Sequence, residues 1–184
     1  MRRDTLAKRA LVLWTLAIGW AALASLFTKA GFRINETPSA PVGLWRVTPV
    51  EGPPTRGAYV SFCPPDTPIF RLAKDRGYIA KGACASGLQP LLKSVAAVAG
   101  DQVVLDENGF WVNGHLVSNS RVKIQDKRGR PMPTLSFYST IVPEGEVWLV
   151  SSSHASSFDS RYFGPVATSE IEGVAKPVRV FDQH

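Results

Sequence analysis

The sequence is poor in the residues that bind metals and build disulfide networks, since its 184 residues include two cysteines and three histidines. With no second cysteine pair and no histidine near the first, we expect neither a metal site nor another cofactor. Glycine and proline together make about 16% of the chain, too little for a fibrous or disordered protein. No internal repeat is visible, so the length predicts one ordinary folded domain, with room for a small insertion.

Excess positive charge is also scarce outside the N-terminus. The formal charge is +6, but residues 1–30 hold five basic groups against one acidic group, and the rest of the chain is nearly balanced. The basic stretch 121–130 is an alternative site for DNA, but it follows an export segment and has no access to cytoplasmic DNA. We therefore expect no nucleic acid partner.

Residues 10–27 form an 18-residue run without a charge. As a helix the run spans roughly 27 Å, close to the hydrocarbon thickness of a bilayer. Four basic residues precede it and one follows closely, so the positive-inside rule keeps the N-terminus cytoplasmic and exports the remainder. Three interpretations stay open: a retained anchor, a signal peptide cleaved after the Ala-Leu-Ala of 22–24, and a buried core helix.

Cys63 and Cys84 fit the exported part of the chain. An even cysteine count outside the cytoplasm favours one disulfide between them. The closed loop would stabilise the fold by about 3 kcal/mol in the chain-entropy treatment.

The exported part has the pattern of a mainly antiparallel β domain. No stretch after residue 30 keeps an amphipathic helical period for three turns, whereas short apolar runs alternate with turn residues. The Asn-Gly dipeptide at 113–114, between apolar runs, is a strong hairpin signal. The expected strands are 57–62, 91–98, 102–105, 110–112, 115–117, 146–151 and 174–181, and residues 120–136 are expected to form an exposed loop or flap.

Two short segments carry a hydroxyl and an amine suited to catalysis. Ser39 lies between two prolines, in a segment too proline-rich for a helix or a central strand, although such serines are commonly turn residues. Strand alternation places Lys93 on one face with apolar neighbours. Burial would lower its pKa, as a lysine general base requires; the alternative is an edge-strand lysine that extends to water.

A third segment, SFDSRYFGPV at 157–166, holds Asp159 and Arg161 two positions apart. Such a pair can fix the shape of a loop, and the alternative is a plain surface turn. The order and spacing of the three segments resemble the type I signal peptidase superfamily of Ser–Lys peptidases. Within it, Pro-Val-Gly-Leu-Trp after Ser39 and Pro-Leu-Leu-Lys-Ser-Val around Lys93 resemble the TraF-type conjugal-transfer peptidases.

The resemblance implies a signal-peptidase-like β domain at residues 31–184, in the bacterial periplasm, behind the segment 1–30 at the inner membrane. It implies Ser39 as nucleophile and Lys93 as base, with Thr37 and Ser157 as supporting residues. Asp159 with Arg161 would hold the late loop. The expected substrate is a pilin precursor or another exported membrane protein, and the expected state is a monomer.

Alternatives to this function remain. Ser39 is not followed by the methionine pair of the housekeeping enzymes, which argues against cleavage of secretory precursors, but that activity stays an alternative. Two further alternatives are a Ser-His-Asp site that uses His154 near Asp159 and a non-catalytic component of an envelope assembly. The resemblance to the conjugal-transfer branch implies that the N-terminus of the pilin attacks the acyl-enzyme and closes the subunit into a ring, but the sequence alone does not separate hydrolysis from cyclisation.

Overall fold

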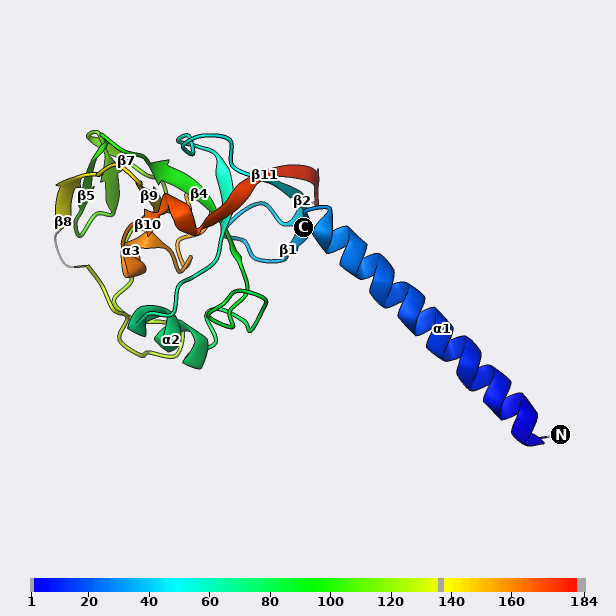
Figure 1. Cartoon of the computed structure of the whole chain (residues 1–184). Coiled ribbons are helices and arrows are strands. Elements are labelled where there is room, and N and C mark those ends of the chain that lie inside the picture. The colour runs from blue at the N-terminus through cyan, green and yellow to red at the C-terminus, as the bar shows by residue number, and fades with distance from the viewer. Residues whose placement is uncertain (1, 136–137, 182–184) are drawn as a thin grey trace.

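The computed structural model describes residues 2–135 and 138–181. Helix α1 (Arg2–Lys29) stands away from a body built mostly of strands (Figure 1). Its segment Leu11–Lys29 is apolar and long enough to cross a membrane, and none of it is buried. A core helix packs at least one face, so the buried-helix interpretation of residues 10–27 is wrong. Membrane anchor and signal segment remain.

The larger sheet has seven strands in the order β1-β2-β11-β3-β4-β9-β10, and every neighbouring pair is antiparallel. The mainly antiparallel β prediction is confirmed. Strand β4 lies between β3 and β9 inside this sheet, not at its edge. The strands are β1 (Phe32–Asn35), β2 (Gly43–Thr48), β3 (Tyr59–Phe62), β4 (Leu91–Ala97), β9 (Glu146–Leu149), β10 (Val166–Ala167) and β11 (Ile171–Val180).

The smaller sheet has four strands in the order β7-β6-β5-β8. They are β5 (Gln102–Leu105), β6 (Phe110–Val112), β7 (His115–Leu116) and β8 (Tyr138–Ile141). Asn113 and Gly114 join β6 to β7 with φ angles of 50° and 77°. Both central residues of a type I′ turn need positive φ, so the hairpin predicted from Asn-Gly is present for the expected reason.

Several short elements were not predicted from the sequence: the helices α2 (Pro68–Asp75), α3 (Ser160–Phe163) and η1 (Thr168–Glu170), and the strands β1, β2, β8 and β10. All of them have eight residues or fewer and show too few periods to be recognised. The expected loop at 120–136 is largely irregular over its described residues, with one bridge between Gln125 and Pro131. Residue 136 and the C-terminal His184 lie outside the described part of the chain.

A small apolar cluster around Trp45 and two larger clusters hold the body together. One of the larger clusters contains Phe62 and Leu149 from the larger sheet with Phe70 of α2, and the other surrounds Trp148, which packs on Phe110 of β6. Each alternate residue of β4 is buried, which matches the expected face. A disulfide joins Cys63, just after β3, to Cys84 in the segment between α2 and β4, which confirms the predicted pair.

The connection from α1 to the body is short and tightly bonded. Two residues separate Lys29 from β1, and the Gly31 carbonyl accepts a hydrogen bond from Val47 N at 2.8 Å. Gly31 has a φ of 85°, and a Cβ there would lie 2.2 Å from Val47 O, so another side chain would not fit. The Arg33 guanidinium donates to Thr28 O at 2.8 Å. These contacts hold the end of α1 against the sheet.

Candidate active site

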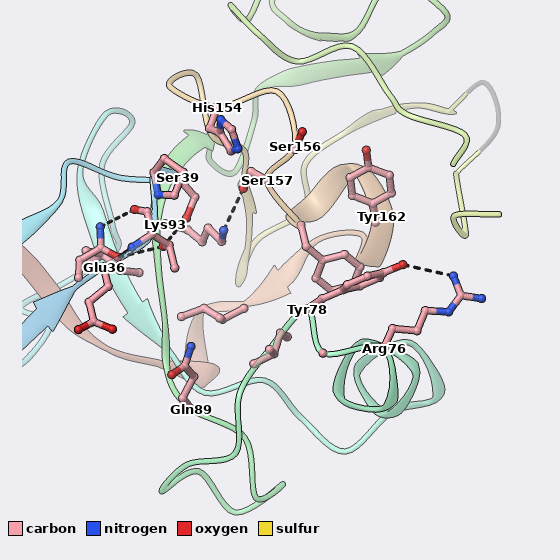
Figure 2. Close-up of a pocket in the computed structure, with 18 of the residues that line it drawn as sticks. Glu36, Ser39, Arg76, Tyr78, Gln89, Lys93, His154, Ser156, Ser157 and Tyr162 are labelled. Atoms are coloured by element: carbon pink, nitrogen blue, oxygen red, sulfur yellow. Dashed lines mark hydrogen bonds between the residues drawn. The ribbon is translucent and has the colours of Figure 1, made fainter. Parts of the chain in front are cut away.

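A pocket of about 750 Å³ brings together segments that are far apart in the chain (Figure 2). Ser39, Lys93 and Ser157 lie close together at one end, and Arg76 and Tyr78 lie across the opening from them. The proline-rich loop after β1, strand β4 and the loop before α3 therefore converge, as the family resemblance implied.

Lys93 is buried because β4 runs inside the sheet. Its side chain is 5% exposed, and its ammonium nitrogen Nζ donates to Ser157 Oγ at 2.9 Å. The alternative of an edge-strand lysine extending to water is therefore wrong. A buried amine with one hydroxyl partner is poorly solvated, which disfavours its charged form.

Burial is the main reason that the pKa of Lys93 falls from 10.5 to about 8. The negative charge of Asp159 raises the pKa and so limits the fall, and the positive charge of Arg161 lowers it further. About a tenth of the amine is then neutral at pH 7, far more than for a lysine with a pKa of 10.5, and a neutral amine has the lone pair that a general base needs.

The loop of Ser39 is held from inside by Asn35, the last residue of β1. The Asn35 amide Nδ2 donates to the carbonyls of Thr37, Ala40 and Pro41 at 2.9, 3.0 and 3.1 Å. A second clamp comes from Ser151, whose hydroxyl donates to the Ser39 carbonyl at 2.8 Å. Both clamps fix backbone and leave the Ser39 hydroxyl at the pocket.

The Ser39 hydroxyl lies 3.1 Å from Thr37 Oγ1, which itself donates to Asn35 Oδ1 at 3.0 Å. With that proton committed to Asn35, Ser39 is the donor in the contact with Thr37. Among the described residues the hydrogen bond of Lys93 Nζ goes to Ser157, not to Ser39. Hydrogen bonds of catalytic groups are often long or misaligned without substrate and tighten when it binds.

Asp159 and Arg161 form a fully buried ion pair behind the pocket. Arg161 Nε and Nη2 each donate to a carboxylate oxygen of Asp159 at 2.7 Å. Asp159 is also the N-cap of α3, and its Oδ2 accepts from Ser151 N at 3.1 Å. One Asp159 oxygen and one Ser151 hydroxyl thus connect the ion pair to the loop of Ser39.

Arg161 also bonds the loop that carries Ser157. Its Nη2 donates to the Ser157 carbonyl at 3.1 Å, and its Nη1 donates to the carbonyls of Asn119 and Arg121 at 3.3 and 3.1 Å. The plain surface turn considered for residues 157–166 is therefore wrong. The pair fixes the position of the hydroxyl that Lys93 contacts.

Comparison with known sequences bears directly on this arrangement. Residues 7–179 match the family described as "Signal peptidase, peptidase S26". The chain belongs to this signal peptidase family. The match covers α1 from residue 7 onward, the loop of Ser39, β4 and the Asp159–Arg161 segment.

Within the signal peptidase family, the chain is similar to proteins named for conjugation. It is 45% identical over 153 residues to "Probable conjugal transfer protein TraF" of Sinorhizobium fredii, covering 82% of this chain and 78% of that protein. It is 44% identical over 149 residues to "Plasmid transfer protein TraF" of Escherichia coli, covering 81% and 83%. It is 40% identical over 175 residues to "Conjugal transfer protein TraF" of Agrobacterium tumefaciens, covering 95% and 97%. The resemblance to the TraF-type branch is confirmed.

A solved signal peptidase I from Enterococcus faecalis overlaps 69% of this chain and 98% of its own chain, with a TM-score of 0.37 and 19% identity. An overlap this loose carries no argument about the site.

His154 does not complete a Ser-His-Asp arrangement in this member of the signal peptidase family. It lines the pocket, but its contact with Ser151 is made by its backbone N–H. The Asp159 carboxylate accepts from Arg161 and from Ser151 N instead. Within residues 2–135 and 138–181, no group of three or more His, Cys, Asp or Glu is placed to hold a metal ion.

Two positioning residues of the site, Asn35 and Ser151, were missed by the sequence analysis. Asn35 lies four residues before Ser39, and an asparagine next to a turn is a signal for local backbone bonding. Ser151 gives no local signal, because its partner Ser39 lies 112 residues away.

Proposed function

We propose that this chain is a serine endopeptidase that uses Ser39 as nucleophile and Lys93 as general base. The observation that carries the proposal is the buried Lys93, with its pKa near 8, at the same end of the pocket as the Ser39 hydroxyl. Membership of the signal peptidase family supports the same reaction class.

In the first step Ser39 Oγ turns from Thr37 toward Lys93. Neutral Lys93 takes the hydroxyl proton while Oγ bonds to the carbonyl carbon of the scissile peptide. The resulting ammonium then gives that proton to the leaving nitrogen as the C–N bond breaks. The products are an acyl-enzyme on Ser39, a free amine and Lys93 returned to its neutral form.

The tetrahedral oxyanion needs donors that face it. The Ser39 backbone N–H is one, and the Thr37 hydroxyl is the second once it releases Asn35 Oδ1. Losing one such donor typically costs 2.7–4 kcal/mol of transition-state stabilisation. Ser157 orients the Lys93 amine, and Asp159 with Arg161 holds the loop of Ser157.

The substrate we propose is a pilin-type or other exported membrane precursor used in conjugative transfer, in keeping with the names of the relatives. Water or an amine then attacks the acyl-enzyme ester. If the amine is the N-terminus of the same pilin, a new peptide bond closes the subunit into a ring and Ser39 regains its proton.

The proposed site of action is the periplasmic surface of the inner membrane. Four basic residues precede the apolar segment of α1, which keeps the N-terminus on the cytoplasmic side. Residues 1–30 are then the tail and anchor or signal segment, and residues 31–184 the periplasmic peptidase domain, acting as a monomer.

Mass spectrometry of a co-expressed candidate pilin tests the proposal. Wild type should yield a shortened pilin, and ring closure should lower its mass by one further water molecule. Ser39→Ala should leave the precursor intact, whereas Ser153→Ala, an exposed serine two residues from the clamp at Ser151, should process normally. Normal processing by Ser39→Ala would instead favour a non-catalytic envelope component.

A further inference from the structure

The pocket is also lined by basic side chains that the proposed chemistry does not use, and one of them, Arg76, lies across the opening from Ser39 (Figure 2). They come from the C-terminal end of α2 and from the irregular segment after β7. We call them the basic wall, and they are Arg76, Lys123, Lys127, Arg128 and Arg130. Asp126 is the one carboxylate on the same stretch of pocket lining.

Asp126 is fully engaged in holding the wall together. Its side chain accepts from Tyr78 Oη at 2.5 Å, from Arg130 Nε at 2.7 Å, and from the backbone N–H groups of Arg128 and Arg130 at 2.8 and 2.9 Å. The bond from Tyr78 is the main reason that the pKa of Asp126 lies well below its usual range. Its single charge offsets Arg130 and leaves the other cations of the wall uncompensated on this stretch.

The two halves of the wall are fixed to each other. Arg76 Nη1 donates to Pro131 O at 2.7 Å, and the Arg130 guanidinium lies over the Tyr78 ring at 5.7 Å. Lys123 N donates to Tyr162 Oη at 3.1 Å, and its Nζ reaches Ser156 Oγ at 2.7 Å. The segment 123–130 is therefore bonded to α2, α3 and the loop of Ser157.

Lys127 and Arg128 are the most available cations of the wall. Both side chains are exposed and line the pocket, and neither side chain has a hydrogen bond or ion pair among the described residues. A cluster of like charges is unfavourable to the fold unless an anion relieves it. The side chains of Lys127 and Arg128 are therefore available to donate hydrogen bonds to a bound anion.

We propose that the basic wall binds a carboxylate of the polypeptide whose scissile bond lies at Ser39. The proposal rests on the proposed peptidase function. The carboxylate belongs either to an acidic side chain a few residues from the scissile bond or to a nearby chain terminus. Arginine and lysine are the residues that pair best with carboxylates, and arginine does so in a bidentate fashion.

A peptide fits this place better than a nucleic acid. The cations line the pocket that holds Ser39 and Lys93, and its volume of about 750 Å³ is in the usual range for a ligand site. An extended peptide bound at Ser39 continues along the same pocket, whereas a duplex needs an open face of cations.

The experiment uses the full chain in neutral detergent with a set of fluorescent peptides. One glutamate is moved along a constant cleavable sequence, each peptide has a glutamine twin, and each is made with a free and an amidated C-terminus. We measure kcat/KM with wild type, and binding by fluorescence anisotropy with Ser39→Ala. The binding arm reports on the wall even if no peptide is cleaved, so it fails independently of the proposed function.

Wild type should prefer glutamate over glutamine at one or two adjacent positions by about three- to tenfold, the range expected for two exposed ion pairs. A preference confined to the free C-terminus would assign the carboxylate to a chain terminus, and also supports the proposal. The double variant Lys127→Gln/Arg128→Gln should abolish the preference, and it should cleave the amidated glutamine peptide, which has neither carboxylate, at the wild-type rate.

The matched control is Lys176→Gln/Arg179→Gln, which removes two exposed cations of β11 outside the pocket and should keep the preference. The proposal is overturned if binding changes neither when glutamate is replaced by glutamine nor when the free C-terminus is amidated. It is also overturned if glutamate helps equally at every position, which is long-range steering, or if an oligonucleotide binds the wall and the peptides do not.

Discussion

Two aspartate–arginine pairs support the same pocket, with identical N–O distances of 2.7 Å and very different surroundings. In the Asp159–Arg161 pair both side chains are 0% exposed, whereas in the Asp126–Arg130 pair they are 8% and 33% exposed. The first lies behind Lys93 and Ser157, and the second shapes the basic wall. The same kind of ion pair therefore has two different roles in this protein, and the difference between them is the extent of burial.

Burial matters because it removes water as a substitute partner. If one member of a buried pair is lost, the other keeps a charge that nothing solvates, and the cost is large. A partly exposed pair that loses one member is rescued by solvent, and the cost is small. The buried pair can thus hold catalytic groups in register, while the outer pair leaves its neighbours free to bind.

The largest effect should come from Arg161→Met. It leaves the Asp159 carboxylate buried and unpaired and frees the carbonyl of Ser157, so we expect the free energy of unfolding to fall by about 3–5 kcal/mol. Urea denaturation of the full chain in detergent measures it. Arg130→Met is the matched control, and an equal loss in the two variants would remove the distinction between the pairs.

The next effect concerns Lys93, which is buried beside the inner pair. Between pH 8 and 10.5 the unfolded chain keeps a proton that folded Lys93 releases, so wild-type stability should rise with pH through that window. Lys93→Met removes this penalty and should stabilise the fold by up to about 3 kcal/mol below pH 8. The gain should vanish above about pH 10.5, and a gain independent of pH would point to packing instead.

Enzyme rate should follow the same amine. Activity should rise with pH through the pKa of Lys93, about 8, and Lys93→Arg should be inactive because a guanidinium does not serve as a base. Asp159 raises this pKa, so Asp159→Asn should move the midpoint to lower pH, while Asp126→Asn should leave it in place. A pH–rate profile of each variant gives the midpoint, and equal shifts would contradict a special role for the inner pair.

The smallest effect should come from Asp126→Asn. The amide oxygen keeps the hydrogen bonds from the backbone N–H groups of Arg128 and Arg130, and solvent reaches the Arg130 side chain, so we expect the smallest loss in the free energy of unfolding among these variants. Thermal unfolding monitored by circular dichroism is sensitive enough to detect it. A loss near that of Arg161→Met would show that the outer pair is as structural as the inner one.

The sequence predicted those parts of the site that depend on local periodicity or close spacing. Alternation in β4 placed Lys93 on a buried face, and the two-residue spacing of Asp159 and Arg161 predicted their pairing. The hairpin at Asn113-Gly114 was predicted because the dipeptide itself adopts the required backbone angles.

The parts that could not be predicted depend on contacts between distant segments. The bond from Ser151 to the Ser39 carbonyl exists because β9 and the loop after β1 meet only in the folded body. The wall formed by Arg76 and residues 123–130 needs α2 packed against an irregular segment 50 residues further along. Neither segment has a hydrophobic period or a sequence motif that predicts this contact.

The short joint between α1 and β1 has a consequence for which bonds are within reach. The connection has two residues, and the hydrogen bonds of Gly31 and Arg33 restrict the movement of the helix relative to the sheet. If α1 is a retained anchor, this short connection holds Ser39 at a fixed distance from the surface of the bilayer. Cleavage would then depend more on the distance of the scissile bond from the membrane than on the sequence around that bond. A precursor whose scissile bond is moved outward by a few residues should escape cleavage even with an unchanged recognition sequence.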